Sequence, residues 1–219
     1  METVFDFGGR YIVIEGADGT GKSTQVRRLS ERLEGQGYEV AQFHEPDGVE
    51  VSRDIRKVIV NGNLARSAFT NLLLFSAARR ENWLQRGLPV LERGGVIVSS
   101  RDYTSTVAYQ GYGEGLSIDT ITEITRLSTD DRYMKPDTTI VLDIDNGVEQ
   151  ERRITQRGDL ENPDTFESMA EEFQRTVREA YRDIARKRGL AVISATQSMD
   201  EVEAAIWEEV TRNSKPAQL

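Results

Sequence analysis

Residues 16–23 read Gly16-Ala17-Asp18-Gly19-Thr20-Gly21-Lys22-Ser23, and this stretch decides the fold. It fits the pattern G-x-x-x-x-G-K-[ST], follows the apolar run 11–14, and opens onto a helical pattern from Ser23 to about Leu33. Glycines let successive backbone N–H groups turn around an anion, and a helix N-terminus adds partial positive charge. A chance match in a glycine-bearing turn is the alternative, but both flanks are correct. The sequence therefore predicts a site for a nucleoside triphosphate.

The loop also predicts which residues hold the nucleotide. Lys22 can reach the β- and γ-phosphates, and the Ser23 hydroxyl can sit on Mg²⁺, so ATP and Mg²⁺ are the expected cofactors. The residues expected to bind the nucleotide are Gly16, Ala17, Asp18, Gly19, Thr20, Gly21, Lys22, Ser23 and Thr24.

The composition limits the class of protein. The 219 residues suit one domain, 1–219. We find no apolar stretch of about 18 residues and no secretion signal, so we expect neither a secreted nor a membrane-spanning protein. The absence of cysteine excludes disulfides and thiolate metal sites and favours the cytoplasm, and the single histidine, His44, rules out a multi-histidine metal site.

The charge balance argues against a protein that coats nucleic acid, because the chain has 37 acidic and 28 basic residues and a net charge of −9. Only five of the basic residues are lysines. Acidic, lysine-poor surfaces suit a high-salt cytoplasm, but a GC-rich genome gives the same arginine bias, so both explanations stay open.

Strand and helix patterns alternate along the chain. We expect strands at 10–15, 38–43, 95–99, 138–144 and 190–194, and helices at 23–33, 50–60, 67–86, 103–110, 118–127, 147–157, 165–188 and 199–211. Pro89 predicts an interruption. The alternation predicts an α/β protein, a three-layer α/β/α sandwich with a five-stranded parallel sheet. Together with the phosphate loop at residues 16–23, it indicates the P-loop NTPase fold. Ligands should gather at the carboxyl ends of the strands.

Apolar residues at helical spacing predict faces that turn toward a core. Residues 50–60 carry such a face, and residues 118–127 form a clean amphipathic pattern. Within residues 67–86, the apolar part is formed by Leu72, Leu73, Phe75 and Ala78. The first two faces consist of Val51, Ile55, Val58 and Ile59, and of Ile118, Ile121, Ile124 and Leu127.

Several further motifs follow the loop in a fixed order. They are Glu45-Pro46, Leu74-Phe75-Ser76-Ala77-Ala78-Arg79, Arg101, Ser105-Thr106-Val107-Ala108-Tyr109-Gln110-Gly111, Pro136-Asp137 and Leu142-Asp143-Ile144-Asp145. In this order and spacing, over nearly the whole chain, the set resembles the thymidylate kinase family. The phosphate loop alone is moderately specific, whereas its combination with L-F-x-A-x-R and S-x-x-A-Y-Q-G is highly specific.

The resemblance implies a role for each matching residue. Asp18 would face the 3′-hydroxyl of the acceptor sugar, and Tyr109 would lie where a ribose 2′-hydroxyl would clash. Phe75 would stack on thymine and Arg79 would hydrogen-bond the base or its phosphate. The remaining residues expected to bind the acceptor are Arg101 at its phosphate, Thr106 and Gln110 at the pyrimidine edge, and Glu45, Pro46 and Ser105.

Each of these residues also has a plainer interpretation. Phe75 lies on the apolar face of a helix, where a core role is about as probable on residue type alone. Arg79 could belong to a solvated helix end, and Tyr109 could simply pack. Arg101 follows a buried strand on the ligand side of the sheet, which favours a functional role.

A run of arginines begins at Arg152, in the place where the family keeps a helical lid, here about residues 152–165. Such a run is more often a solvated face. Some family members carry an arginine inside the phosphate loop, where this chain has Gly19. The charge of the transition state must then be met from elsewhere, so we expect catalytic roles for Arg153 and Arg157, with Lys22 and Arg101.

The chain departs from the family pattern at three places. Ser100 stands where the family usually has the aspartate of D-R-Y, and Asp102 is the expected substitute near Mg²⁺, with Ser23 as the other metal residue. His44 replaces an arginine that often precedes Glu-Pro. The loop 159–162 reads Asp-Leu-Glu-Asn instead of D-R-[IF]-E. These changes affect metal binding, rate and acceptor, but not the fold.

The resemblance predicts transfer of the γ-phosphoryl group of Mg-ATP to dTMP, giving dTDP and ADP, by a cytoplasmic homodimer. One alternative is a kinase of another pyrimidine nucleoside monophosphate or of a deoxynucleoside. A second alternative is a phosphate-loop regulatory ATPase, which would not need S-x-x-A-Y-Q-G or an acid at position 18.

Overall fold

The computed structural model describes residues 5–156, 166, 169–212 and 214–216. Its centre is a five-stranded sheet in which every neighbouring pair is parallel, with the order β3-β4-β2-β5-β6. The strands are β2 Tyr11–Glu15, β3 Val40–His44, β4 Val96–Ser100, β5 Thr138–Asp143 and β6 Ala191–Ser194. The predicted α/β architecture with a five-stranded parallel sheet is confirmed.

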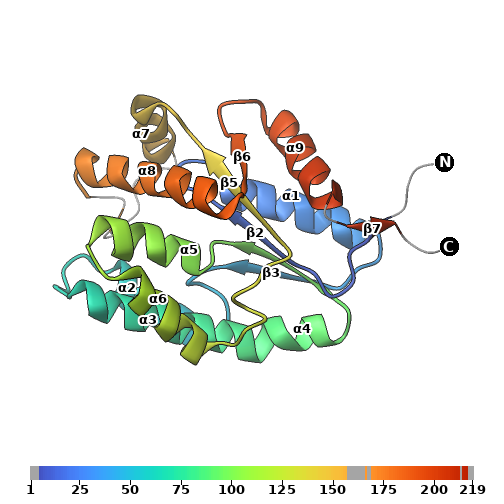
Figure 1. Cartoon of the computed structure of the whole chain (residues 1–219), viewed down its shortest axis with the longest axis horizontal. Helices are drawn as coiled ribbons and strands as arrows, with labels where there is room; N and C mark the ends of the chain where they lie inside the picture. The colour runs from blue at the N-terminus through green and yellow to red at the C-terminus, as the bar shows by residue number, and fades with distance from the viewer. Residues whose placement is uncertain (1–4, 157–165, 167–168, 213, 217–219) are drawn as a thin grey trace.

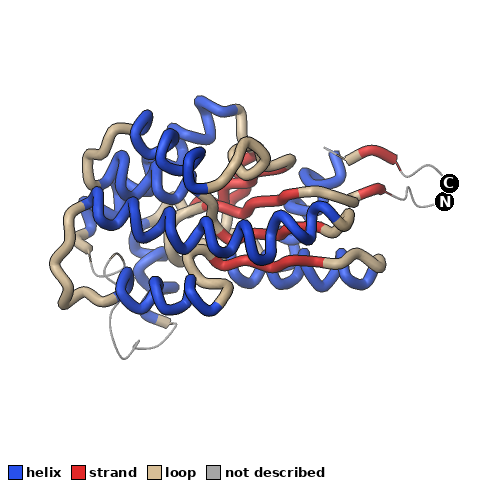
Figure 2. The backbone as a smooth tube through the Cα atoms, turned by 90° about the horizontal axis from the view of Figure 1, so that it is seen from below, coloured by secondary structure: helices blue, strands red, loops and turns tan. Residues whose placement is uncertain are grey.

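Helices cover both faces of this sheet, as Figures 1 and 2 show. On one face, α1 (Lys22–Gly35) and α9 (Met199–Arg212) pack on a core that includes Ile12 and Ile14. On the other face, Tyr11 and Val13 join a second core with Trp83. Successive side chains of β2 therefore enter opposite layers, which is why this strand is buried along its whole length.

The predicted helix 67–86 is part of a longer helical run. It consists of α3 (Ala68–Asn82), a π-helical segment (Trp83–Gly87) and α4 (Leu88–Glu92). Pro89 lies in the first turn of α4, where its missing N–H is tolerated, and the wider π-turn absorbs the change of hydrogen-bond register. The predicted interruption is thus a local π-segment and not the end of the helix.

All three apolar helix faces expected from the sequence are only partly buried. In α3, Leu72 and Ala78 are buried, but Leu73 is 46% exposed. In α2 (Glu50–Val60), Ile59 is buried, but Val51 and Val58 are 47% and 39% exposed. In α6 (Ile118–Ser128), Ile121 is buried and Leu127 is 73% exposed. Helical spacing shows which residues share a face, but not how far the rest of the protein covers that face.

The remaining elements surround the carboxyl ends of the strands or lie at the opposite end of the molecule. The former are α5 (Tyr103–Thr106), a π-helical segment (Val107–Gly113), α7 (Gly147–Thr155) and α8 (Glu171–Arg188). At the opposite end of the molecule, β1 (Phe5–Asp6) and β7 (Lys215–Pro216) form a small antiparallel pair. The sequence patterns did not predict this pair. Within the described part of the chain, every helix is too short or too polar to cross a bilayer.

Candidate active site

The phosphate loop lies between β2 and α1, as its sequence predicts. Gly16 has a φ of +138°, and a Cβ at this position would lie 2.3 Å from the carbonyl oxygen of Leu142. The hydroxyl of Thr20 and the ammonium of Lys22 donate to the carbonyl oxygen of Ala17 at 2.9 and 2.8 Å. The loop is therefore held closed by its own side chains, and Lys22 lies inside it.

A pocket of about 230 Å³ extends from the phosphate loop across the carboxyl ends of the strands. Its wall includes Lys22 and Ser23 of the loop and residues from α2, α3 and α5. Of the residues expected to bind the acceptor, the pocket wall contains Asp18, Glu45, Pro46, Phe75, Arg79, Arg101, Ser105, Thr106, Tyr109 and Gln110. The structure thus brings together the whole acceptor set predicted from the sequence.

Asp18 is the meeting point of the phosphate loop and the acceptor side. Its carboxylate accepts hydrogen bonds from the guanidinium of Arg101 and from the hydroxyl of Tyr109, the latter at 2.6 Å. Its backbone carbonyl accepts from the amide of Gln150 at 2.8 Å. The Arg101 guanidinium also lies over the Tyr109 ring, 5.3 Å from its centre. These contacts place a cation beside the loop.

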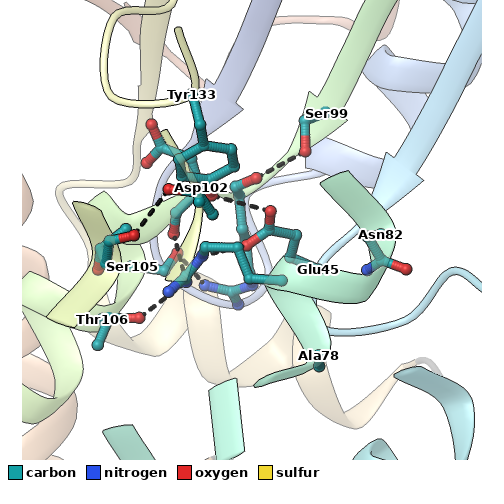
Figure 3. A network of polar contacts seen from close by, with 12 residues as sticks. Glu45, Ala78, Asn82, Ser99, Asp102, Ser105, Thr106 and Tyr133 are labelled. Carbon is teal, nitrogen blue, oxygen red and sulfur yellow. Dashed lines mark hydrogen bonds and ion pairs between the residues drawn. The ribbon is translucent and has the colours of Figure 1, made fainter. Parts of the chain in front are cut away.

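Arg79 lines the pocket and is almost completely buried. Its Nε donates to Glu45 at 3.0 Å and its Nη2 to the hydroxyl of Thr106 at 3.0 Å. The hydroxyl of Tyr133 donates to the second oxygen of Glu45 at 2.9 Å. Figure 3 shows Glu45, Thr106 and Tyr133 converging from separate segments. Burial raises the pKa of Glu45, and Arg79 and Tyr133 oppose that rise.

Arg79 keeps one donor for a ligand. Its Nη1 is buried and has no hydrogen-bond partner among the described residues. A buried unpaired donor is costly unless a ligand satisfies it. The interpretation of Arg79 as a solvated helix end is wrong, because this side chain is only 2% exposed.

Phe75 and Gln110 complete the walls near Arg79. Phe75 is half-buried, and its ring centre lies 6.0 Å from that of Phe166. Gln110 is buried and donates to Glu114 at 2.9 Å, which fixes its amide orientation. The pocket therefore combines an aromatic side chain, Phe75, with buried polar groups of Arg79, Thr106 and Gln110, a combination that suits a planar base.

Ser100 and Asp102 both line the pocket, but they differ in surroundings. Arg101 between them has a φ of +76°, so the chain turns instead of alternating as a strand does. One oxygen of Asp102 accepts from the backbone N–H of Thr104 at 2.6 Å and caps α5. The other is buried with no hydrogen-bond partner in the described chain.

His44 lies in the pocket wall beside the phosphate loop. Burial, followed by the charges of Lys22 and Arg101, lowers its pKa below the usual value. The imidazole is therefore neutral near pH 7. It does not supply the fixed positive charge of the arginine that often stands at this position in the family.

The arginines expected in the lid are only partly visible. Arg153 donates to Glu149 at 2.7 Å and to the backbone carbonyl of Ala195 at 2.8 Å, so it binds the loop after β6. Arg152 pairs with the same glutamate. Arg157 and residues 158–165 lie outside the described residues. The catalytic role expected for Arg153 stays a prediction.

Four residues that organise the site lie outside the motifs recognised in the sequence. Glu15, at the end of β2, is fully buried and accepts hydrogen bonds from Ser105 and from Tyr181 of α8. Burial, and then the charge of Asp102, raise the pKa of Glu15 to about 7, although Arg101 opposes this. The others are Tyr133, Tyr181 and Gln150. A charged residue ending an apolar strand was the signal available for Glu15.

A phosphate loop that shares one pocket with an arginine-lined acceptor site defines a nucleoside monophosphate kinase of the P-loop class. The family model for thymidylate kinase matches residues 14–206. The chain belongs to the thymidylate kinase family.

Individual relatives agree with this assignment. A thymidylate kinase of Halothermothrix orenii is 34% identical over 204 residues, covering 92% of this chain and 96% of that protein. One of Rhodopseudomonas palustris strain TIE-1 is 38% identical over 206 residues, covering 92% and 88%. The crystal structure of thymidylate kinase from Ehrlichia chaffeensis is 27% identical, has a TM-score of 0.73, and matches 92% of this chain and 97% of that one.

Proposed function

We propose that the protein transfers the γ-phosphoryl group of ATP to the 5′-phosphate of dTMP, with Mg²⁺ as the metal. The observation that carries this proposal is the contact of Asp18 with Arg101 and Tyr109, where the phosphate loop meets the acceptor pocket. A dianionic acceptor at Arg101 would lie beside the triphosphate held by the loop. Because a phosphate is already an anionic nucleophile, positioning and charge neutralisation do most of the catalytic work.

On the donor side, Lys22 and the loop backbone would hold the triphosphate. Mg²⁺ commonly takes one or two protein ligands, keeps several waters and binds phosphate oxygens. Among the described residues, no cluster of three or more His, Cys, Asp or Glu side chains is arranged to hold an ion alone. The Ser23 hydroxyl and, through water, the unpartnered oxygen of Asp102 are a donor set that suits Mg²⁺. Bound Mg²⁺ would offset the negative charge of the phosphates.

On the acceptor side, Arg101 would bind the 5′-phosphate, because a guanidinium matches phosphate oxygens in geometry and charge. The free Nη1 of Arg79 would donate to a carbonyl oxygen of the base, and Phe75 would stack on the ring. Tyr109, held against Asp18, would fill the space beside the sugar and disfavour a ribose.

A coupled ADP-release assay with Mg-ATP tests the proposal, with dTMP, dUMP, dCMP, dGMP or UMP added one at a time as the acceptor. We expect turnover with dTMP well above the others. Comparable rates with several pyrimidine nucleotides would contradict strict specificity for dTMP and indicate a kinase that accepts several pyrimidine monophosphates. ATP binding without acceptor-dependent turnover would favour the regulatory ATPase instead.

We further propose that two copies pair through the outer face of α2 and α3, and that the enzyme works in the cytoplasm. Val51, Val58, Phe69 and Leu73 on this face are 39–47% exposed, a concentration of large apolar side chains that a partner surface would cover. The same helix α3 carries Phe75 and Arg79 into the pocket, so a second copy would steady the acceptor site.

Sedimentation velocity tests the homodimer. We expect a dimer for the wild type and a monomer for Phe69→Glu. Val148→Glu, which also replaces an exposed apolar side chain but on α7, is the control and should leave the dimer intact. A monomeric wild type at micromolar concentration would refute the proposal.

A further inference from the structure

The carboxylate of Glu15 gathers hydrogen-bond donors from two other segments of the chain. Its Oε1 accepts from the backbone N–H groups of Asp102 and Ser105 at 2.8 and 3.1 Å. Its Oε2 accepts from the hydroxyl of Ser105 at 2.8 Å and from that of Tyr181 at 3.1 Å. A buried carboxylate is tolerated when such donors surround it, and here they come from the segment 102–105 and from α8.

These donors lie on the segment that begins with Arg101. The left-handed conformation of Arg101 (φ +76°) costs a non-glycine residue about 1–2 kcal/mol, so the surroundings must impose it. Its N–H donates to the carbonyl of Ile14 at 3.1 Å, and its carbonyl accepts from the Ser99 hydroxyl at 2.7 Å. The next N–H, that of Asp102, is the one that Glu15 binds. Strand β2 therefore fixes the backbone on both sides of Arg101.

The same carboxylate also reaches the head of the Arg101 side chain. Nη1 of Arg101 donates to the hydroxyl of Ser105 at 3.0 Å and to that of Tyr181 at 3.3 Å. Both hydroxyls are ligands of Glu15 and lie 2.7 Å from each other. Because each hydroxyl can direct its proton to the carboxylate, its oxygen is free to accept from the guanidinium.

We infer that Glu15 is a positioning residue that holds Arg101, backbone and guanidinium together, in the orientation that receives the acceptor phosphate. Glu15 immediately precedes Gly16, so it joins the acceptor-binding arginine to the phosphate loop itself. The inference rests on the proposed role of Arg101 in binding the phosphate of dTMP.

Replacement by glutamine separates positioning from simple stability. A glutamine at position 15 has the same size, and its carbonyl can still accept from the two backbone N–H groups. Its amide, however, donates to the two hydroxyls. Each hydroxyl would then accept from both the amide and the guanidinium, which uses its two lone pairs, so either the 2.7 Å hydrogen bond between Ser105 and Tyr181 or a contact with Arg101 must be given up. The backbone stays in place while the orientation of the Arg101 side chain is lost.

The experiment measures steady-state kinetics with dTMP and ATP varied separately, together with thermal unfolding, for the full chain. Glu15→Gln should raise KM for dTMP about tenfold, the effect of one lost hydrogen bond to a charged group, and leave KM for ATP within about twofold. Its Tm should not fall below that of the wild type at pH 8. Glu34→Gln, on the exposed side of α1, is the matched control and should change neither constant.

Two further variants keep the result decisive. Ser105→Ala removes one link between Glu15 and the guanidinium and should raise KM for dTMP about threefold, so it decides the case if Glu15→Gln does not fold. Arg101→Lys reports on the proposed function itself. An unchanged KM for dTMP in Glu15→Gln, beside a raised one in Arg101→Lys, overturns the inference alone. An equal rise of both KM values with a lowered Tm also overturns it. No effect of Arg101→Lys refutes the proposed role of Arg101.

Discussion

The phosphate loop and the acceptor pocket lie side by side, but they are built in different ways. The loop consists of consecutive residues 16–23 and works mainly through its backbone, so its pattern is visible in the sequence. The neighbouring pocket is lined by side chains from α2, α3 and α5, and its Arg101 is supported by Glu15 of β2 and Tyr181 of α8. These segments are far apart in the chain. A backbone site depends on glycine conformation, whereas a side-chain site depends on buried charge pairs and their supports. Substitutions in the two regions should therefore fail for different reasons.

The largest effect is expected in the loop. Gly16→Ala places a Cβ 2.3 Å from the carbonyl oxygen of Leu142 at a φ of +138°, so the backbone must shift. We expect a loss of about 4 kcal/mol in the free energy of unfolding, with loss of ATP binding. Gly35→Ala, with no atom near its Cβ at the end of α1, should be neutral or slightly stabilising. Denaturant unfolding of both variants checks this, and equal effects would contradict it.

In the pocket, the largest effect should come from Arg79. Arg79→Met leaves the buried carboxylate of Glu45 without its charge partner, which costs about 3 kcal/mol and removes the donor for the base. The neighbouring Arg80→Met removes an exposed side chain and should change stability by less than about 0.5 kcal/mol. Urea unfolding measures the difference. A stable Arg79→Met variant that still binds dTMP would show that the pocket does not depend on this ion pair.

The stability of the protein should depend on pH through Glu15. Because the pKa of Glu15 is raised to about 7 in the folded protein, its protonated form is favoured by folding, and this contribution is lost as pH rises from about 4.5 through 7. Glu15→Gln does not titrate. Its stability relative to the wild type should therefore increase by about 2 kcal/mol between pH 5.5 and pH 8. Unfolding curves at several pH values check this, with Glu34→Gln as control, and a constant difference would contradict the raised pKa.

The smallest effect is expected at Tyr109. Tyr109→Phe removes the 2.6 Å hydrogen bond to Asp18 but keeps the ring, so kcat/KM for dTMP should fall about tenfold. Discrimination against UMP should weaken as well. Tyr112→Phe is the matched control, because its hydroxyl binds Asp183 outside the pocket wall, and it should retain the wild-type kcat/KM. Equal values for the two variants would assign Tyr109 a packing role only.

The sequence predicted the five strands and most helix positions, and its motifs singled out residues that the structure brings together in one pocket. It did not predict how far neighbours cover each surface. Val51 and Leu127 have the spacing of core residues yet stay exposed. The helical run continues through Pro89 to Glu92, because a π-turn ahead of the proline absorbs the change of register. The exposure of these side chains and the course of the helix depend on packing between elements, and helical periodicity carries no information about that packing.

By itself, the sequence determined the phosphate loop, since eight consecutive residues and their flanks carry its whole geometry. Only the tertiary structure decided how the acceptor side is supported. Glu15 bonds to Tyr181 across 166 positions of the chain, and Glu45 bonds to Tyr133 across 88. A local pattern records propensity and spacing, but the environment of a buried charge exists only after distant segments have packed together.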